Sequence, residues 1–310
     1  MSIKVSELTK LYGEQKALKN VSFEIQSGQV VGFLGPNGAG KSTMMKIITC
    51  FIPQTSGKAW VCGYDVEEES IRVRENIGYL AEHNPLYLDM YVKEYLEFVA
   101  ELHKVKKVQS RIAEMVEITG LQGEQKKKIG ALSKGYCQRV GLAQAMIHDP
   151  KVLILDEPTT GLDPNQLAEI RGLITEIGKQ KTVIFSTHIM QEVEAVCQRV
   201  IIINKGEIVA DEKTEELQKS LGNKQLITVE FDKETLKSAL MNIRGIQDAL
   251  HLHTNSWQLQ AGLEKDVRPA IFQFAVQQGL TVLTMNKEDR RLEDIFKQLT
   301  KADPEPIKSN

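Results

Sequence analysis

The sequence contains few cysteines, no long apolar run and almost no net charge. Its four cysteines show no Cys-x-x-Cys spacing, so we expect free thiols and a reducing compartment. The opening stretch, MSIKVSELTK, has no apolar signal-peptide core. No apolar run approaches the roughly 18 residues that a membrane-spanning helix requires. These absences predict a soluble, cytoplasmic protein.

Neither the charge balance nor the histidine spacing indicates a nucleic-acid or metal-binding protein. Lys and Arg number 39 against 41 Asp and Glu, so no nucleic-acid partner is expected. The short lysine clusters at 104–107 and 126–128 lack interleaved aromatic residues, and we interpret them as solvated helix faces. His251 and His253 would face the same side of a strand, but without further ligands they predict no metal site.

Hydrophobic patterning predicts an α/β domain over residues 1–220. Apolar positions at helical spacing make residues 86–148 mostly helical, and a further helix is expected after Pro164. The strands are expected at 3–9, 21–25, 29–34, 151–156 and 181–186, with a hairpin at 199–210.

A second, small α+β domain is predicted over residues 224–301. Strand and helix patterns follow one another there in the order βαββαβα. The expected strands are 225–231, 249–253, 257–262 and 280–286, and the expected helices are 232–243, 266–279 and 292–300. The remaining residues, 302–310, are expected to form a disordered tail.

The segment GPNGAGKS, residues 35–42, fits the phosphate-loop pattern G-x-x-x-x-G-K-[ST], after a buried strand and at the start of a helix. Its glycines allow backbone N–H groups to surround phosphate oxygens at the positive end of that helix. Lys41 is expected to reach the β- and γ-phosphates, Ser42 to hold Mg²⁺ and Thr43 to contact the α-phosphate. The nucleotide contacts expected from this segment are Gly35, Asn37, Gly38, Ala39, Gly40, Lys41, Ser42 and Thr43.

Two further segments place polar groups at the ends of apolar strands. In KVLILDEP, Asp156 ends the strand, where a carboxylate can hold the magnesium shell. Glu157 follows, where it can accept a proton from an attacking water. His188 comes after the next strand and is expected to contact the γ-phosphate. A small GTPase would carry Asn-Lys-x-Asp for guanine, and residues 204–207 read NKGE, which excludes that class.

The segment ALSKGY begins a helix that is locally unfavourable. Ser133 is a reasonable N-cap, but Tyr136 stands where a capping box has Glu or Gln. Gly135 in the first turn costs about 1 kcal/mol relative to alanine. A helix start that leaves N–H groups uncovered suits an anion. Because the chain already has one phosphate loop, we predict that this second site serves the nucleotide held by another subunit.

Taken together, these segments resemble the motifs of the ABC-transporter ATPases. LSKGY, residues 132–136, resembles the LSGGQ signature and lies between the phosphate loop and LDEP, as in that family. Tyr12 in LYG resembles the aromatic residue that stacks on adenine. Asp163 in GLD resembles the D-loop residue that communicates across the dimer. His188 matches the switch histidine, and Glu157 matches the catalytic glutamate.

The resemblance covers residues 1 to about 220. It implies a P-loop NTPase fold of the ABC ATPase type, with a RecA-like core, an antiparallel β subdomain and a helical subdomain, here followed by the small C-terminal domain. It also implies a Mg²⁺-dependent ATPase that forms a head-to-tail dimer. Each ATP would lie between Lys41 of one copy and Ser133, Lys134 and Gly135 of the other. A separate transmembrane permease would be the second partner, which would place the chain on the inner face of the cell membrane.

Two departures from the family pattern narrow the resemblance. Glu82 stands where a glutamine is usual; its carboxylate can still reach Mg²⁺ or a water ligand of the ion. In the signature, Lys134 and Tyr136 replace glycine and glutamine. Both changes are familiar in bacterial ABC-2 type exporters of the drug-resistance and sodium-efflux group. The whole chain more closely resembles the ATP-binding subunit of the gliding-motility-associated ABC transporter. The expected contact with the permease is the segment 82–98.

Two other functions remain open from the sequence. One is a non-transport ABC ATPase that acts as an ATP-gated switch or clamp on DNA or ribosomes, but such proteins carry long coiled coils or a second fused ATPase domain. The other is an ATPase switch in which residues 224–301 form a regulatory interaction module. A neighbouring gene for a multi-span membrane protein would favour the exporter.

Overall fold

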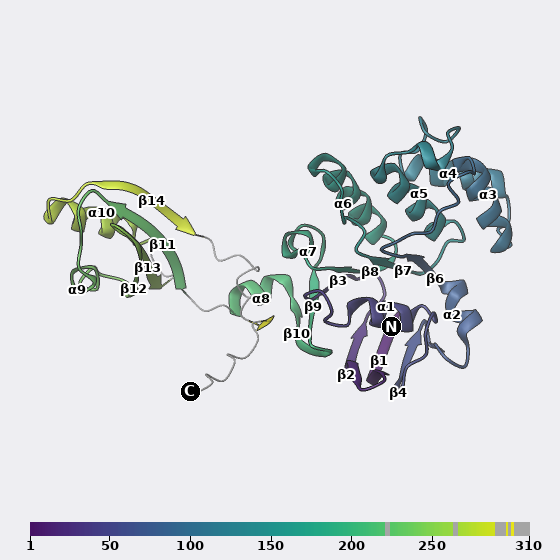
Figure 1. The fold of residues 1–310 in the computed structure, drawn as a ribbon, viewed down its shortest axis with the longest axis horizontal. Coiled ribbons are helices and arrows are strands. Elements are labelled where there is room, and N and C mark those ends of the chain that lie inside the picture. The colour runs from purple at the N-terminus through teal and green to yellow at the C-terminus, as the bar shows by residue number, and fades with distance from the viewer. Residues whose placement is uncertain (221–223, 263–265, 289–295, 297–298, 301–310) are drawn as a thin grey trace. The chain divides into compact units, whose positions relative to one another are not determined.

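The computed structural model describes residues 1–220, 224–262, 266–288, 296 and 299–300 (Figure 1). These residues form two compact units, one built on Met1–Thr214 and the other within Glu215–Gln298. The expected helix at 292–300 falls largely outside the described residues, and the expected tail at 302–310 falls entirely outside them.

The first unit is organised around a six-stranded sheet with the strand order β10-β9-β3-β8-β7-β6. Neighbouring strands from β9 to β6 are parallel, and β10 is antiparallel to β9. Strands β3, β7 and β8 are buried along their whole length, as expected for parallel strands that are covered on both faces. The bounds are β3 Val30–Leu34, β6 Ile77–Leu80, β7 Val152–Asp156, β8 Thr182–Thr187, β9 Arg199–Asn204 and β10 Glu207–Lys213.

An antiparallel sheet and helices cover the two faces of the six-stranded sheet (Figure 1). Helix α1 (Lys41–Ile48) and the sheet of order β2-β1-β4-β5 lie on one face and share one hydrophobic core with it. Helices α6 (Pro164–Gly178) and α7 (Met190–Val196) lie on the other face. The antiparallel strands are β1 Ile3–Tyr12, β2 Gln15–Ile25, β4 Ser56–Val61 and β5 Tyr64–Asp65; α2 spans Ser70–Asn76 and packs against β5.

The mostly helical region expected at 86–148 is confirmed and forms three packed helices with a short 3₁₀ turn before the last of them (Figure 1). Of the apolar positions at helical spacing in α3, Tyr95 and Val99 are buried, whereas Phe98 and Leu102 are exposed. The helices are α3 Val92–Leu102, α4 Val108–Ile118 and α5 Lys134–Met146, and the 3₁₀ turn is Ile129–Ala131.

Just beyond α5, the ring of His148 stacks on that of His103, with the ring centroids 4.0 Å apart. His148 Nε2 pairs with the carbonyl oxygen of Ile77 at 2.9 Å. Burial and the neighbouring His103 lower the pKa of His148 to about 4, and Lys181 and Arg111 act in the same direction. The folded protein therefore keeps His148 neutral at pH values where an exposed histidine takes up a proton.

We expect this histidine to make the fold less stable in mild acid. Between about pH 6.5 and pH 4 only the unfolded chain protonates His148, so the free energy of unfolding falls with falling pH by up to about 1.4 kcal/mol per pH unit. Urea denaturation of the wild type at pH 7 and pH 5 measures the effect. The His148→Gln variant should show a smaller difference between the two pH values, and an equal difference would contradict this role for His148.

In its described residues, the second unit has a four-stranded antiparallel sheet of order β12-β13-β11-β14, against which helices α9 and α10 pack. Its core contains Phe231, Leu259 and Ile271. The elements are β11 Lys224–Phe231, α9 Lys237–Leu240, β12 Ile246–His253, β13 Ser256–Gly262, α10 Arg268–Gln277 and β14 Val282–Glu288; α8 (Thr214–Ser220) precedes them.

The helix expected at 232–243 is wrong in length, because α9 has only four residues. Asp232 is instead tied to the segment before β14. Its N–H donates to the carbonyl of Thr281 at 3.0 Å, and its carboxylate accepts the N–H of Thr281 at 2.7 Å. This reciprocal pair uses the N–H and carboxylate of Asp232 at the point where the sequence pattern starts the helix.

Candidate nucleotide site

The phosphate-loop segment connects β3 to α1 and has a backbone that requires glycine. Gly40 has a φ of 111°, in the left-handed region, and a Cβ there would lie 2.6 Å from the carbonyl oxygen of Ala17. As the N-cap residue of α1, Gly40 provides no side-chain hydrogen bond to the first turn. The N–H groups at this helix start therefore remain available to an anion, as the glycine spacing predicts.

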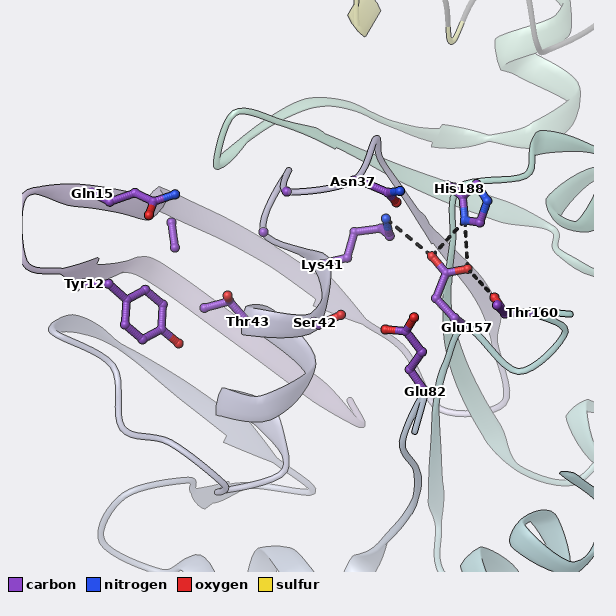
Figure 2. Close-up of a pocket in the computed structure, with 13 residues that line it drawn as sticks. Tyr12, Gln15, Asn37, Lys41, Ser42, Thr43, Glu82, Glu157, Thr160 and His188 are labelled. Carbon is purple, nitrogen blue, oxygen red and sulfur yellow. Dashed lines mark hydrogen bonds and ion pairs between the residues drawn. The ribbon is translucent and has the colours of Figure 1, made fainter. Parts of the chain in front are cut away.

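A cavity of about 570 Å³ opens beside this loop (Figure 2). Ten residues that the sequence assigns to the site line it: Tyr12, Asn37, Gly38, Gly40, Lys41, Ser42, Thr43, Glu82, Glu157 and His188. Three more that the sequence did not indicate also line it: Gln15, Ala17 and Thr160. Gly35 and Ala39 do not line the cavity, although Gly35 contacts Lys41 through its carbonyl.

Lys41, Glu157 and His188 converge at one end of this cavity from three separate segments (Figure 2). The buried Lys41 Nζ donates to the Gly35 carbonyl at 2.8 Å and lies 3.4 Å from Glu157 Oε1. His188 Nδ1 lies 2.9 Å from Glu157 Oε2. Thr160 Oγ1 donates to the same carboxylate oxygen at 3.2 Å. The Glu157 carboxylate thus stands within hydrogen-bonding range of both an ammonium that can bind phosphate and an imidazole, which suits phosphoryl transfer.

Ser42, Asp156 and Glu82 supply oxygen donors beside the loop. The Ser42 hydroxyl donates to Asp156 Oδ1 at 3.3 Å. All three residues line a neighbouring cavity of about 420 Å³, together with Tyr79, whereas Asp156 does not line the cavity beside the loop. Burial raises the pKa of Tyr79, and the negative charges of Asp156 and Glu82 raise it further. The region is therefore favourable for a cation.

This donor set suits Mg²⁺ in company with a nucleotide. Within the part of the chain that the structure describes, no group of three His, Cys, Asp or Glu side chains could hold a metal ion. Mg²⁺ usually binds through one or two carboxylates and completes its shell with water and substrate phosphates. The residues present fit that pattern, and they do not form a cage that would hold the ion alone.

Tyr12 lies at the end of the cavity away from Glu157 (Figure 2). It ends β1, and 48% of the residue is exposed, so its ring is accessible to a flat ligand. The Lys10 ammonium approaches the ring, with Nζ 5.3 Å from the centroid. A nucleotide in the cavity would have its base near Tyr12 and its phosphates near Lys41.

Ser133 and Gly135 do not line this cavity. Ser133 is the N-cap residue of α5, where its hydroxyl accepts the N–H of Tyr136 at 3.4 Å. The serine therefore caps the helix without a capping box. Gly135 lies against Gln166 of α6, since a Cβ at this glycine would be 2.7 Å from Gln166 Cδ. Packing against Gln166 therefore also favours glycine at position 135.

Lys134 and Asp163 also lie where α5 and α6 begin, and neither lines the cavity. Asp163 is the N-cap residue of α6, and its carboxylate accepts the N–H of Gln166 at 2.9 Å in a capping box. The Lys134 ammonium lies over Gly161, where any side chain would collide with it. The four residues that the sequence assigns to a dimer contact are therefore gathered at a second place, made by the starts of two helices.

Comparison with known proteins identifies the family. The family model described as ABC transporter matches residues 18–160. The bacitracin transport ATP-binding protein BcrA of Bacillus licheniformis is 32% identical over 96% of this chain and 96% of its own length. The chain belongs to the ABC transporter ATP-binding proteins. The linearmycin resistance ATP-binding protein LnrL of Bacillus subtilis is 31% identical to this family member, over 96% of this chain and 98% of its own length.

The solved structures of ABC cassettes confirm the predicted fold class. The ATP-binding cassette MJ0796, in a dimeric post-hydrolysis state bound to ADP and Pi, matches with a TM-score of 0.63 and 28% identity, over 68% of this chain and 98% of its own length. Our ABC family member is accordingly an ATPase that binds and hydrolyses ATP. Among its described residues, no helix is both long enough and apolar enough to cross a membrane.

Proposed function

We propose that this chain is the ATP-binding subunit of an ABC-2 type exporter and powers a separate transmembrane subunit from the inner face of the cell membrane. Relatives that match almost the whole chain support this, because their names assign them to bacitracin transport and linearmycin resistance. A narrower role in gliding motility rests on the sequence resemblance alone. The observation that carries the proposal is the cavity in which Lys41, Glu157 and His188 converge.

The residues of the cavity divide the work of ATP hydrolysis. Lys41 binds the β- and γ-phosphates, and the loop N–H groups surround them. Glu157 takes the proton of the attacking water, and His188 contacts the γ-phosphate while it pairs with Glu157. Mg²⁺, held by Ser42 and Asp156 with Glu82 nearby, would neutralise charge on the phosphates. Tyr12 stacks on the adenine.

The second group of residues completes the site of another copy. Ser133, Lys134 and Gly135 bind the ATP held by the partner's phosphate loop, and Asp163 contacts the partner. The location of Ser133, Lys134 and Gly135 at the start of α5, and of Asp163 at the start of α6, outside the cavity of their own chain, supports this division. The dimeric form of the cassette MJ0796 supports a paired arrangement.

Two domains carry out these functions in the proposal. Residues 1–220 form the ABC ATPase domain and residues 224–301 an accessory domain. The division of the chain into a unit on Met1–Thr214 and a unit within Glu215–Gln298 supports a boundary close to α8. The segment 82–98, which begins at the cavity residue Glu82, is the proposed contact with the transmembrane subunit.

The proposal predicts that transport requires both subunits. We expect proteoliposomes that contain a candidate transmembrane subunit to transport only when this chain and Mg-ATP are added on the same side. The measurement is accumulation of a labelled candidate peptide antibiotic, with the Glu157→Gln variant of the chain as a control. Transport by this chain alone would contradict the proposal. ATP hydrolysis that never responds to the transmembrane protein would favour the ATP-gated clamp.

A further inference from the structure

The adjacent carboxylates Asp156 and Glu157 both reach the phosphate loop, which a regular strand would not allow. Successive side chains of a strand point to opposite faces of the sheet. Yet Asp156 bonds Ser42 and Glu157 approaches Lys41, both in the same turn of α1. Glu157 has a φ of 51°, in the left-handed region, and this turn out of β7 brings its side chain to the side that Asp156 faces.

The left-handed conformation of Glu157 is unfavourable for a residue with a Cβ, so the surroundings must hold it. The contacts come from the neighbouring strand β8, where Ser186 pairs with Asp156 in the sheet. The Glu157 N–H donates to the Ser186 carbonyl at 3.1 Å and to the Ser186 hydroxyl at 3.2 Å. Both acceptors of the Glu157 N–H are thus oxygens of Ser186.

The same hydroxyl also fixes Asp156. Ser186 Oγ donates a hydrogen bond to Asp156 Oδ1, which also accepts a hydrogen bond from the Ser42 hydroxyl. Ser186 is fully buried and does not line the nucleotide cavity. Its hydroxyl therefore touches both carboxylate residues and has no position from which to contact the nucleotide itself.

We infer that Ser186 is a positioning residue for ATP hydrolysis. Through one hydroxyl it holds the Asp156 carboxylate toward Ser42 and the Glu157 backbone in the turn that presents its carboxylate to the phosphates. This inference rests on the proposed roles of Asp156 and Glu157. A serine that served only as a buried strand residue would not need hydrogen bonds to both Asp156 and Glu157.

The test is the Ser186→Ala variant in steady-state ATP hydrolysis. We expect kcat to fall about 10- to 100-fold, because a misplaced reacting group costs rates of that order. The KM for ATP should stay within about threefold of wild type, because Lys41 and the loop that bind the nucleotide are unchanged. The Mg²⁺ concentration for half-maximal activity should rise, because Asp156 loses a hydrogen-bond donor.

The matched control removes a buried hydroxyl from the other end of β8. Thr182 is buried, and its hydroxyl bonds Ser2 Oγ and the N–H of Gly28, both at 2.9 Å. Thr182→Val should keep the wild-type kcat and Mg²⁺ dependence. If circular dichroism shows that Ser186→Ala does not fold, Ser186→Cys takes its place. This variant fills the site but offers only a weak donor, and it should show the same loss of kcat.

The outcomes separate this inference from the proposed function. A wild type that hydrolyses ATP and an equally active Ser186→Ala would overturn the inference and leave the proposed function standing. A loss of kcat in Thr182→Val as large as in Ser186→Ala would also overturn it, since any buried hydroxyl of β8 would then matter equally. A Glu157→Gln variant with wild-type kcat would instead contradict the proposed role of Glu157.

Discussion

Replacing Glu157 by Gln is expected to lower kcat for ATP hydrolysis by about 100- to 10,000-fold, the usual contribution of a general base. The amide has the shape of the carboxylate but cannot accept the proton of the attacking water. Binding of ATP should persist, because the Lys41 ammonium has the Gly35 carbonyl as a second partner and need not move. Loss of the negative charge 3.4 Å from Lys41 also leaves that ammonium freer for the phosphates.

The measurement is phosphate release under saturating Mg-ATP, together with binding of a fluorescent ATP analogue. The matched control is Glu176→Gln, which removes the same charge from an exposed position on α6 where it pairs with Lys179. This control should keep the wild-type kcat. A Glu157→Gln variant that hydrolyses ATP at a tenth of the wild-type rate or more would contradict the assignment of Glu157 as the base.

Site residues could be predicted from the sequence where a single local segment determines their position. The glycine spacing around Lys41 follows from the backbone of the loop, in which Gly40 adopts a positive φ and approaches Ala17 closely. Asp156 could be placed because a continuous apolar run ends there, and such a run predicts a buried parallel strand. In both cases the sequence pattern and the position in the structure come from the same short segment, so the prediction agrees with the structure.

Residues that reach the cavity from elsewhere left no such pattern. Gln15 and Ala17 lie on β2 of the antiparallel sheet and reach the cavity only through the packing of that sheet around α1. Ser186 directly follows three apolar residues of β8 and has the sequence context of an ordinary strand residue. Its contacts with Asp156 and Glu157 depend on the pairing of β7 with β8, which a single sequence does not specify. Thr160 is the exception, since it lies only three residues after Glu157.

Shorter elements show the same limit. β6 has four residues and no alternation, and it becomes a strand because β7 provides a parallel partner along its length. In the second unit, the helix expected at 232–243 does not begin at Asp232, because Asp232 forms long-range hydrogen bonds with Thr281 instead. Tertiary hydrogen bonds of this kind override local propensity by satisfying the same backbone groups in another way.

Replacing Ser133 by Arg is expected to abolish ATP-induced dimerisation of the Glu157→Gln variant. The proposed dimer places the start of α5 against the phosphates bound to the partner subunit. A guanidinium there would fill the space of the serine and stand close to the lysine that already holds those phosphates. Binding of ATP to the chain's own loop should be unchanged, because Ser133 does not line its cavity.

Light scattering with and without Mg-ATP measures the change from monomer to dimer. The matched control is Ser110→Arg, which adds the same side chain at an exposed position of α4 and should leave dimerisation intact. Because Ser133 caps α5, its replacement also costs stability, but a lost N-cap is worth only about 1 kcal/mol. Thermal unfolding in the absence of nucleotide shows whether the Ser133→Arg chain remains folded.

The pair of variants distinguishes a nucleotide contact from a helix cap. If Ser133 only capped α5, the Ser133→Asn variant would dimerise as well as the chain with Ser133, because asparagine retains a capping oxygen. The Ser133→Arg variant would then lose dimer only to the extent that it loses folding stability. If the segment binds the partner's ATP, the folded Ser133→Arg chain binds ATP as a monomer at every protein concentration tested. A Ser133→Arg chain that still dimerises with Mg-ATP would move the contact between subunits away from the start of α5.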